Sequence, residues 1–349
     1  MRSLHVSAVL ASFSILIFLS SASSQAQDTA KAGDDSPTIA QLRTMIDRGH
    51  TAEALKQLDT LAAQRPVAAG VNRLRGLALY SQNQFAEADT AFANALKDDP
   101  HDADAAQLRG LTLFRLGRAA EAIPLLESAP HWTSQTKVDP SYVLALCYIE
   151  TRQYDGARRA LAAQFGFAPD SAAAYLLAAR FMLRREDPLQ AQRFAAKALE
   201  LDSGLPLAHE LLGEIALAGE HVDVAVAEFE KEQLRDPLEG GIYDRLGDAY
   251  TRAGDYTKAQ QSLERALLLE PTATGPYILL GKVLLRRQDP ASAVMYLERA
   301  EKMDPNNFMT HSLLGQAYRL LGRKEDASRE TQTSEQLQAA NAPKLEAVH

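Results

Sequence analysis

A repeated spacing constrains this chain more than any other feature of its sequence. Alanines recur at steps of 34 residues, with a single step of 35. This column comprises Ala54, Ala88, Ala122, Ala157, Ala191, Ala225, Ala259, Ala293 and Ala327. Small residues stand twelve positions before it, at Gly76, Gly110, Ala145, Ala179, Gly213, Gly247, Gly281 and Gly315. Prolines stand twelve positions after it, at Pro66, Pro100, Pro169, Pro237, Pro271 and Pro305. Three columns that keep one phase indicate a tandem array of a single structural unit.

Each unit has the pattern of two helices joined by a short turn. Apolar residues recur at helical spacing over residues 242–250 and again over residues 256–267. The small residues are expected where the two helices cross closely, and the prolines are expected to end the second helix. Glycines such as Gly254 and Gly322 fall between the helices, where the left-handed conformation ends a helix. We therefore expect an all-α chain.

The pattern resembles the tetratricopeptide repeat, a helix-turn-helix unit of 34 residues. The unit that closes at Pro271 matches at Tyr243, Leu246, Gly247, Tyr250, Ala259, Ala266 and Pro271, with Leu263 in place of phenylalanine. The resemblance covers residues 37–338 and implies a right-handed superhelical solenoid of about nine hairpins. The first unit, residues 37–66, lacks the Leu-Gly pair, as expected of a terminal capping repeat. The third unit lacks its closing proline, and residues 129–140 intervene there.

The first residues have the pattern of an export signal. Arg2 precedes an apolar run over residues 6–19, and Ser24-Gln25-Ala26 places small residues at a peptidase site. We expect a signal peptide over residues 1–26, a polar linker over 27–36 and a frayed tail over 339–349. The alternative is an uncleaved anchor, for which the run is short, since spanning takes roughly 20 residues. A periplasmic or secreted protein without stable membrane insertion is expected.

Catalytic and metal-binding patterns do not stand out. There is no glycine-rich phosphate loop after a strand and no His-Glu-x-x-His pair. We expect no enzyme activity, cofactor or metal. The net charge of −8 disfavours a general nucleic-acid binder, which usually carries a basic face. Cys147 is the only cysteine, and its apolar neighbours indicate a core position.

The resemblance implies that the first helix of each unit lines an inner groove, which would bind a protein or peptide partner. The inward candidates are Tyr80, Phe114, Tyr142, Leu146, Arg180, Arg184, Glu210, Glu214, Asp244, Asp248, Lys282 and Arg286. Glu210 and Glu214, like Asp244 and Asp248, are four residues apart and share a helix face. We expect these four carboxylates to form an acidic patch that receives a basic segment of the partner.

Two other interpretations stay open. In one, the charges are solvated and the apolar side chains are buried between units. In the other, the chain is a glycan-binding or cell-wall-binding accessory subunit that uses Tyr80, Phe114, Tyr142 and Trp132 to stack on sugar rings.

Overall fold

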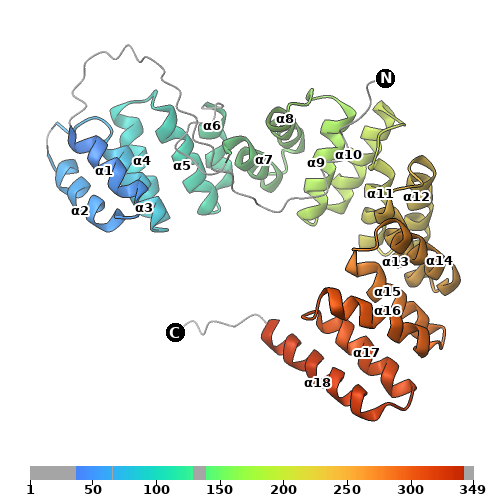
Figure 1. The fold of residues 1–349 in the computed structure, drawn as a ribbon. Coiled ribbons are helices and arrows are strands. Elements are labelled where there is room, and N and C mark those ends of the chain that lie inside the picture. The colour runs from blue at the N-terminus through green and yellow to red at the C-terminus, as the bar shows by residue number, and fades with distance from the viewer. Residues whose placement is uncertain (1–36, 65, 129–138, 342–349) are drawn as a thin grey trace. The chain divides into compact units, whose positions relative to one another are not determined.

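A computed structural model describes residues 37–64, 66–128 and 139–341 of the chain, and within these residues every regular element is a helix (Figure 1). The expected all-α fold is confirmed. The proposed signal peptide, the linker, Trp132 and residues 342–349 lie outside the described residues. None of the described helices combines the length and the apolar character needed to cross a membrane.

The eighteen helices of the described residues alternate between the first and second positions of a hairpin. The first helices are α1 (Pro37–Asp47), α3 (Val71–Ser81), α5 (Ala103–Arg115), α7 (Pro140–Glu150), α9 (Ala172–Arg184), α11 (Ala208–Ala218), α13 (Gly240–Ala253), α15 (Thr274–Arg286) and α17 (Phe308–Leu320). The second helices are α2 (Thr51–Ala62), α4 (Phe85–Asp98), α6 (Ala119–Ser128), α8 (Tyr154–Phe165), α10 (Pro188–Leu201), α12 (Val222–Arg235), α14 (Tyr256–Leu269), α16 (Pro290–Met303) and α18 (Lys324–Asn341). The last helix ends at Asn341, slightly beyond the expected end of the array at residue 338.

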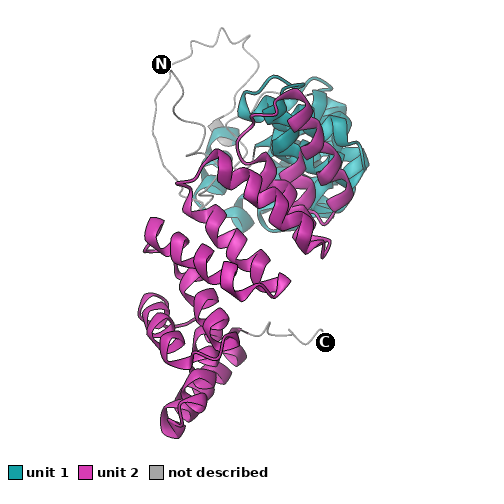
Figure 2. Cartoon of the chain, turned by 90° about the vertical axis from the view of Figure 1, so that its right-hand side faces the viewer, with its two compact units in different colours: residues 1–178 teal, residues 179–349 magenta. Residues whose placement is uncertain are grey.

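The chain divides into two compact units, residues 1–178 and residues 179–349 (Figure 2). In both units the helices of a hairpin pack on each other, as α3 does on α4 and α13 does on α14. Second helices also pack on the first helix of the next hairpin, as α4 does on α5 and α14 does on α15. This arrangement follows from the amphipathic character of each hairpin, whose apolar surface is completed by its neighbour.

The small-residue columns mark the tight helix crossings that the sequence predicts. Every alanine of the first column is buried, with an exposed fraction of at most 5%. A Cβ atom added at Gly247 would lie 2.5 Å from the side chain of Leu263, and one at Gly213 would lie 2.4 Å from the ring of Phe229. These distances are too short for real contacts, so at these two crossings a larger residue than glycine would force the facing side chain to move.

The turn inside each hairpin holds one residue in the left-handed conformation. Its φ is 78° at Gly254 and 75° at Gly322, as the sequence predicts. The same turn position elsewhere holds Asn83, Arg152, Glu186, Glu220 and Gln288, with φ between 58° and 62°. The sequence prediction missed this recurrence because it relied on glycine to mark the turn. The turn needs a positive φ in each of these hairpins, whichever residue occupies it.

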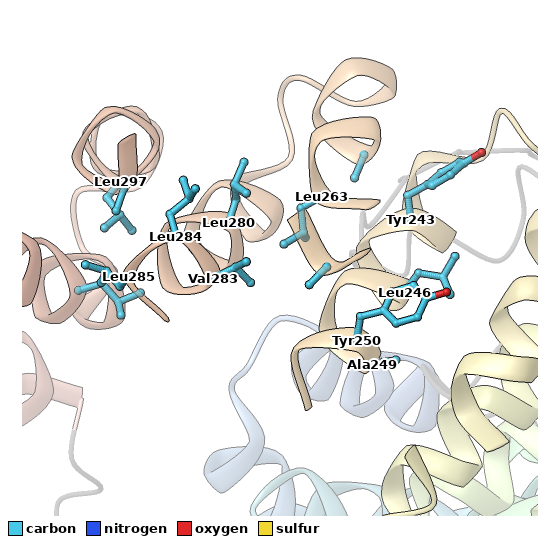
Figure 3. Packing of buried hydrophobic residues seen from close by; sticks show 14 of the residues in the cluster. Tyr243, Leu246, Ala249, Tyr250, Leu263, Leu280, Val283, Leu284, Leu285 and Leu297 are labelled. Carbon is cyan, nitrogen blue, oxygen red and sulfur yellow. The ribbon is translucent and has the colours of Figure 1, made fainter. Parts of the chain in front are cut away.

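The apolar core of the second unit illustrates how hairpins share side chains (Figure 3). Leu246 of α13 and Leu263 of α14 are almost fully buried, with exposed fractions of 1% and 0%. Leu280 and Val283 of α15 belong to the same buried cluster and have no exposed surface. The core is therefore continuous from one hairpin to the next within this unit.

The prolines that close the units also accept hydrogen bonds. The hydroxyl of Tyr243 donates to the carbonyl of Pro237 at 3.0 Å, and that of Tyr277 donates to Pro271 at 3.2 Å. A second recurring bond joins consecutive hairpins, since the hydroxyl of Tyr250 donates to a carboxylate oxygen of Glu230 at 2.5 Å. These bonds satisfy polar groups at the junctions between repeats.

Candidate functional site

The candidate residues of the first unit are mostly engaged in packing. Tyr80 is half-buried, and its ring meets the ring of Phe85 edge to face, with centroids 5.3 Å apart. Phe114 and Tyr142 are also half-buried. Leu146 has an exposed fraction of 8% and therefore contributes to the core, offering little surface to a partner. The three described aromatic candidates are thus only partly accessible to a ligand.

The second unit contains a polar surface built from the first helices of its hairpins. Helix α15 contacts both α13 and α17, so the exposed sides of these first helices adjoin one another. We call this surface the first-helix face. Its charged and polar members are Glu210 and Glu214 on α11, Asp244, Arg245, Asp248 and Arg252 on α13, Lys282 and Arg286 on α15, and Ser312, Gln316 and Arg319 on α17.

The acidic residues of this face are largely paired within the chain. Arg245 approaches Glu214 with its Nη2 atom 2.6 Å from Oε1, and its Nε atom lies 3.5 Å from Glu210. Arg180 lies 3.8 Å from the other oxygen of Glu210. Burial and the charge of Glu214 raise the pKa of Glu210 above its usual value despite these guanidinium groups. The four-carboxylate patch is thus partly neutralised by arginines that the fold itself supplies.

Asp248 has an intrahelical partner, whereas Asp244 has none. Arg252 lies one turn after Asp248, with Nη2 2.8 Å from Oδ2. No ion pair involves Asp244 among residues 37–64, 66–128 and 139–341. A Cβ atom at Gly275 would lie 3.7 Å from Oδ2 of Asp244, which places this carboxylate beside the first turn of α15. Burial raises the pKa of Asp244, and Asp248 adds to the rise although Arg245 opposes it.

The basic candidates differ in their surroundings. Arg180 is paired with Glu210, while Arg184 at the end of α9 is exposed. Lys282 and Arg286 are exposed on α15, and neither forms an ion pair with any described residue. The cations that pair with the acidic residues of this face are Arg245 and Arg252, together with Arg180. The four-residue spacing from Asp248 to Arg252 was the signal that the sequence offered for one of these pairs.

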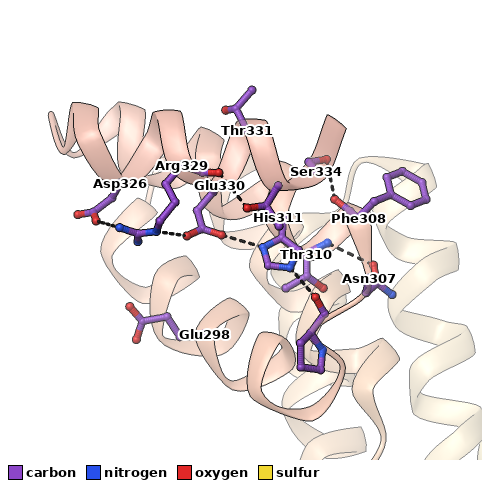
Figure 4. Close-up of polar contacts among 12 residues, drawn as sticks. Glu298, Asn307, Phe308, Thr310, His311, Asp326, Arg329, Glu330, Thr331 and Ser334 are labelled. Atoms are coloured by element: carbon purple, nitrogen blue, oxygen red, sulfur yellow. Dashed lines mark hydrogen bonds and ion pairs between the residues drawn. The ribbon is translucent and has the colours of Figure 1, made fainter. Parts of the chain in front are cut away.

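A titratable cluster at the end of the array tests the expectation of no metal site (Figure 4). One potential ligand atom each from Glu301, His311 and Glu330 lies within 4.8 Å of the others. Nδ1 of His311 is 2.7 Å from Oε2 of Glu330, and Nε2 is 2.8 Å from the carbonyl of Pro305. Both ring nitrogens face acceptor oxygens, which favours the doubly protonated imidazolium, whose two N–H groups can donate both bonds.

The cluster is therefore a buried ion pair that holds α17 against α18. His311 and Glu330 each have an exposed fraction of 4%. Burial alone lowers the pKa of His311, but the bonds to Glu330 and to Pro305 outweigh it, so the pKa is raised above its usual value.

A pocket of about 300 Å³ lies between α12, α13 and α14 and was not anticipated from the sequence. Its lining includes Tyr250, whose hydroxyl bonds Glu230 and whose ring lies 5.2 Å from the Lys258 amine. The charged groups of its lining, Glu230 and Lys258, thus both contact Tyr250. Cys147, the remaining candidate for reactivity, is buried, and burial raises its pKa to about 12, so it is an inert core residue.

Comparison with known protein families agrees with the repeat pattern. Models described as tetratricopeptide repeat match residues 40–88, 73–133 and 278–332, residues 113–181, and residues 241–273, which together span more than half of the chain. The chain belongs to the tetratricopeptide repeat family. This membership accounts for the hairpin array and for the three sequence columns, and members of the family bind protein or peptide partners.

Individual similar proteins match part of this tetratricopeptide repeat chain. The superkiller complex protein 3 of Mus musculus is 24% identical over 252 residues, covering 67% of this chain and 16% of the mouse protein. The chain therefore spans a small part of that relative's length. Among solved structures, "MamA 41-end from Desulfovibrio magneticus RS-1" has a TM-score of 0.47 and 20% identity, covering 50% of this chain and 98% of that one. "Crystal structure of YrrB: a TPR protein with an unusual peptide-binding site" has a TM-score of 0.44 and 22% identity, covering 49% and 89%.

Proposed function

We propose that this protein is a non-catalytic scaffold that binds a segment of a partner protein on the first-helix face of its second unit. The observation that carries the proposal is the concentration of charged side chains on helices that contact one another. A continuous surface of this kind can follow an extended or helical segment over several hairpins. The charged side chains of this surface also make its binding specific for partner segments with a complementary pattern of charges.

A basic side chain of the partner meets the acidic part of this face in our proposal. Among the four carboxylates of this part, Asp244 is the one that forms no ion pair with a described residue, and its raised pKa reflects the cost of a half-buried charge. A lysine or arginine of the partner would lower that cost. Reversing Glu214 and Asp248 to lysine should then weaken partner binding and reduce its dependence on salt, while the helical content is unchanged.

We also propose that the protein is exported, because of the sequence of residues 1–26. Signal cleavage after Ala26 would leave a mature chain that begins at Gln27. Intact-mass spectrometry of the protein recovered from its native host would measure this end. A retained Met1 would contradict both the cleavage and the exported location.

Site-specific photo-crosslinking in the native host tests where partners bind. In one variant, benzoylphenylalanine replaces Gln316 and places the crosslinker on the first-helix face. In the other, it replaces Gln261 and places the crosslinker on α14. Both glutamines are exposed, so the two variants form a matched pair. A discrete protein adduct from position 316 alone is the expected result.

Other outcomes would redirect the proposal. Adducts from position 261 alone would move the binding site to the pocket between α12, α13 and α14. Carbohydrate adducts, together with binding to a glycan array, would support the accessory-subunit interpretation. Absence of adducts from both positions would contradict the scaffold proposal.

A further inference from the structure

The pairing of charges on the first-helix face is uneven between its two ends. The carboxylates of Glu210 and Glu214 on α11 and of Asp248 on α13 each lie within 4 Å of a guanidinium group of the same chain. Those groups belong to Arg180 on α9 and to Arg245 and Arg252 on α13. On α15 and α17, Lys282, Arg286 and Arg319 have no such carboxylate among the described residues. The free charge at the α15–α17 end is therefore positive, although the whole chain carries a net charge of −8.

These three cations stand on one accessible surface. Gly275, Lys282 and Arg286 are exposed along one side of α15, while Leu280 and Val283 on the other side are buried. On α17 the exposed side carries Ser312, Gln316 and Arg319, with spacings of four and three residues. Since α15 and α17 contact each other, their exposed sides adjoin.

We propose that the α15–α17 end of the first-helix face binds an acidic segment of a partner polypeptide, whose carboxylates pair with Lys282 and Arg286. This inference rests on the proposed function and adds the chemistry of the partner. Residues four apart on a helix have Cβ atoms about 5–6 Å apart. Alternate residues of an extended chain lie about 6.6 Å apart on one side, because the rise is about 3.3 Å per residue. The spacing fits a segment with acidic residues at alternate positions, running along α15.

The neighbouring helix limits what else this end can bind. Asp244 and Asp248 on α13 would repel a uniformly charged polyanion such as single-stranded RNA. A polypeptide can instead combine acidic residues over α15 with a basic or neutral residue near Asp244. Exposed apolar groups at Met309 and Leu320, with exposed fractions of 45% and 59%, suit apolar residues that flank the acidic ones.

Selection from a random peptide library tests the proposal without knowledge of the natural partner. The full-length protein would be immobilised and challenged with a phage library of random dodecapeptides. In parallel, the selection would use the Lys282→Glu/Arg286→Glu variant and the control Arg299→Glu/Lys302→Glu. The control residues are exposed on α16, and neither forms an ion pair with a described residue. Both variants replace two basic residues by glutamate, so they change the net charge equally. Circular dichroism would verify that all three proteins are folded.

We expect the wild type and the control to enrich peptides with Asp or Glu at alternate positions, and the α15 variant to lose this enrichment. A synthetic selected peptide should bind the α15 variant roughly tenfold more weakly, since two attractions become repulsions. Binding to the wild type should weaken as salt is raised. Enrichment of basic peptides, or equal acidic enrichment with the α15 variant, would overturn the acidic-segment proposal while the scaffold function stands. Tight binding of RNA would also overturn it, and enrichment of no peptide at all would count against the scaffold function itself.

Discussion

Replacing Gly247 by alanine tests whether the glycine column is required by close helix packing. The new Cβ would lie 2.5 Å from Cγ and Cδ2 of Leu263, a side chain with no exposed surface. Forcing extra carbon into a packed core costs about 1–3 kcal/mol. Alanine is a better helix former than glycine by about 1 kcal/mol, which opposes this cost. We therefore expect a net loss of roughly 0–2 kcal/mol in the free energy of opening the α13–α14 hairpin.

Gly275→Ala separates the two contributions. Gly275 is exposed in the first turn of α15, and its added Cβ would meet only Oδ2 of Asp244, at 3.7 Å. Only the gain in helix propensity applies there, so this control should be neutral or slightly stabilised. Native-state hydrogen exchange of amides in α13–α15, read by mass spectrometry, would measure both changes locally.

A second substitution checks the geometry of the contact. The hairpin that contains Ala179 has Ala195 at the position equivalent to Leu263, so the sequence already pairs alanine with alanine at this crossing. Leu263→Ala alone should lower the free energy of opening the hairpin by about 2–5 kcal/mol. The double variant Gly247→Ala/Leu263→Ala should lose less than the sum of the two single losses. If Gly247→Ala stabilises the hairpin as much as Gly275→Ala does, the close-packing argument is refuted.

Three further predictions concern single positions. Glu220→Gly should raise the melting temperature by relieving a left-handed φ of 60°, with a gain of about 1 kcal/mol; an unchanged or lower value would mean that the turn carries no strain. The raised pKa of His311 means that its ion pair with Glu330 stabilises the fold fully below about pH 6.5 and is lost as pH rises through the folded-state pKa. The melting temperatures of wild type and Glu330→Gln should therefore differ most at acidic pH and converge as pH rises, and a difference that does not depend on pH would contradict the ion pair. Cys147, whose pKa is about 12, should resist a thiol-specific dye in the native protein and react after unfolding, whereas rapid native labelling would show that the core is open there.

Much of the fold follows from spacing alone. The alanine, glycine and proline columns are set by backbone geometry that recurs in every hairpin, so a single sequence displays them many times over. The left-handed turn position was harder to recognise, because Arg152, Glu186 and Gln288 satisfy the same geometry without glycine. The backbone there is dictated by the two helices that the turn joins.

The candidate site was less predictable for a different reason. Sequence spacing predicted that Glu210, Glu214, Asp244 and Asp248 share one surface, and in the structure they are half-buried on α11 and α13. It could not show which cation reaches which carboxylate, because the pairing depends on side-chain length and helix separation. The long side chain of Arg245 spans from α13 to α11 and holds Glu214, whereas Lys282 on α15 forms no ion pair within the part of the chain that the structure describes.

Paramagnetic relaxation enhancement tests most directly whether a partner segment binds the first-helix face. A selected peptide carrying a nitroxide would be added to the protein with labelled methyl groups. Signals of Ile278 on α15 and Met309 on α17 should broaden, while those of Leu268 on α14 and Met295 on α16, which are exposed on second helices, should stay sharp. Broadening confined to Leu268 and Met295 would contradict the proposal that the first helices bind the partner.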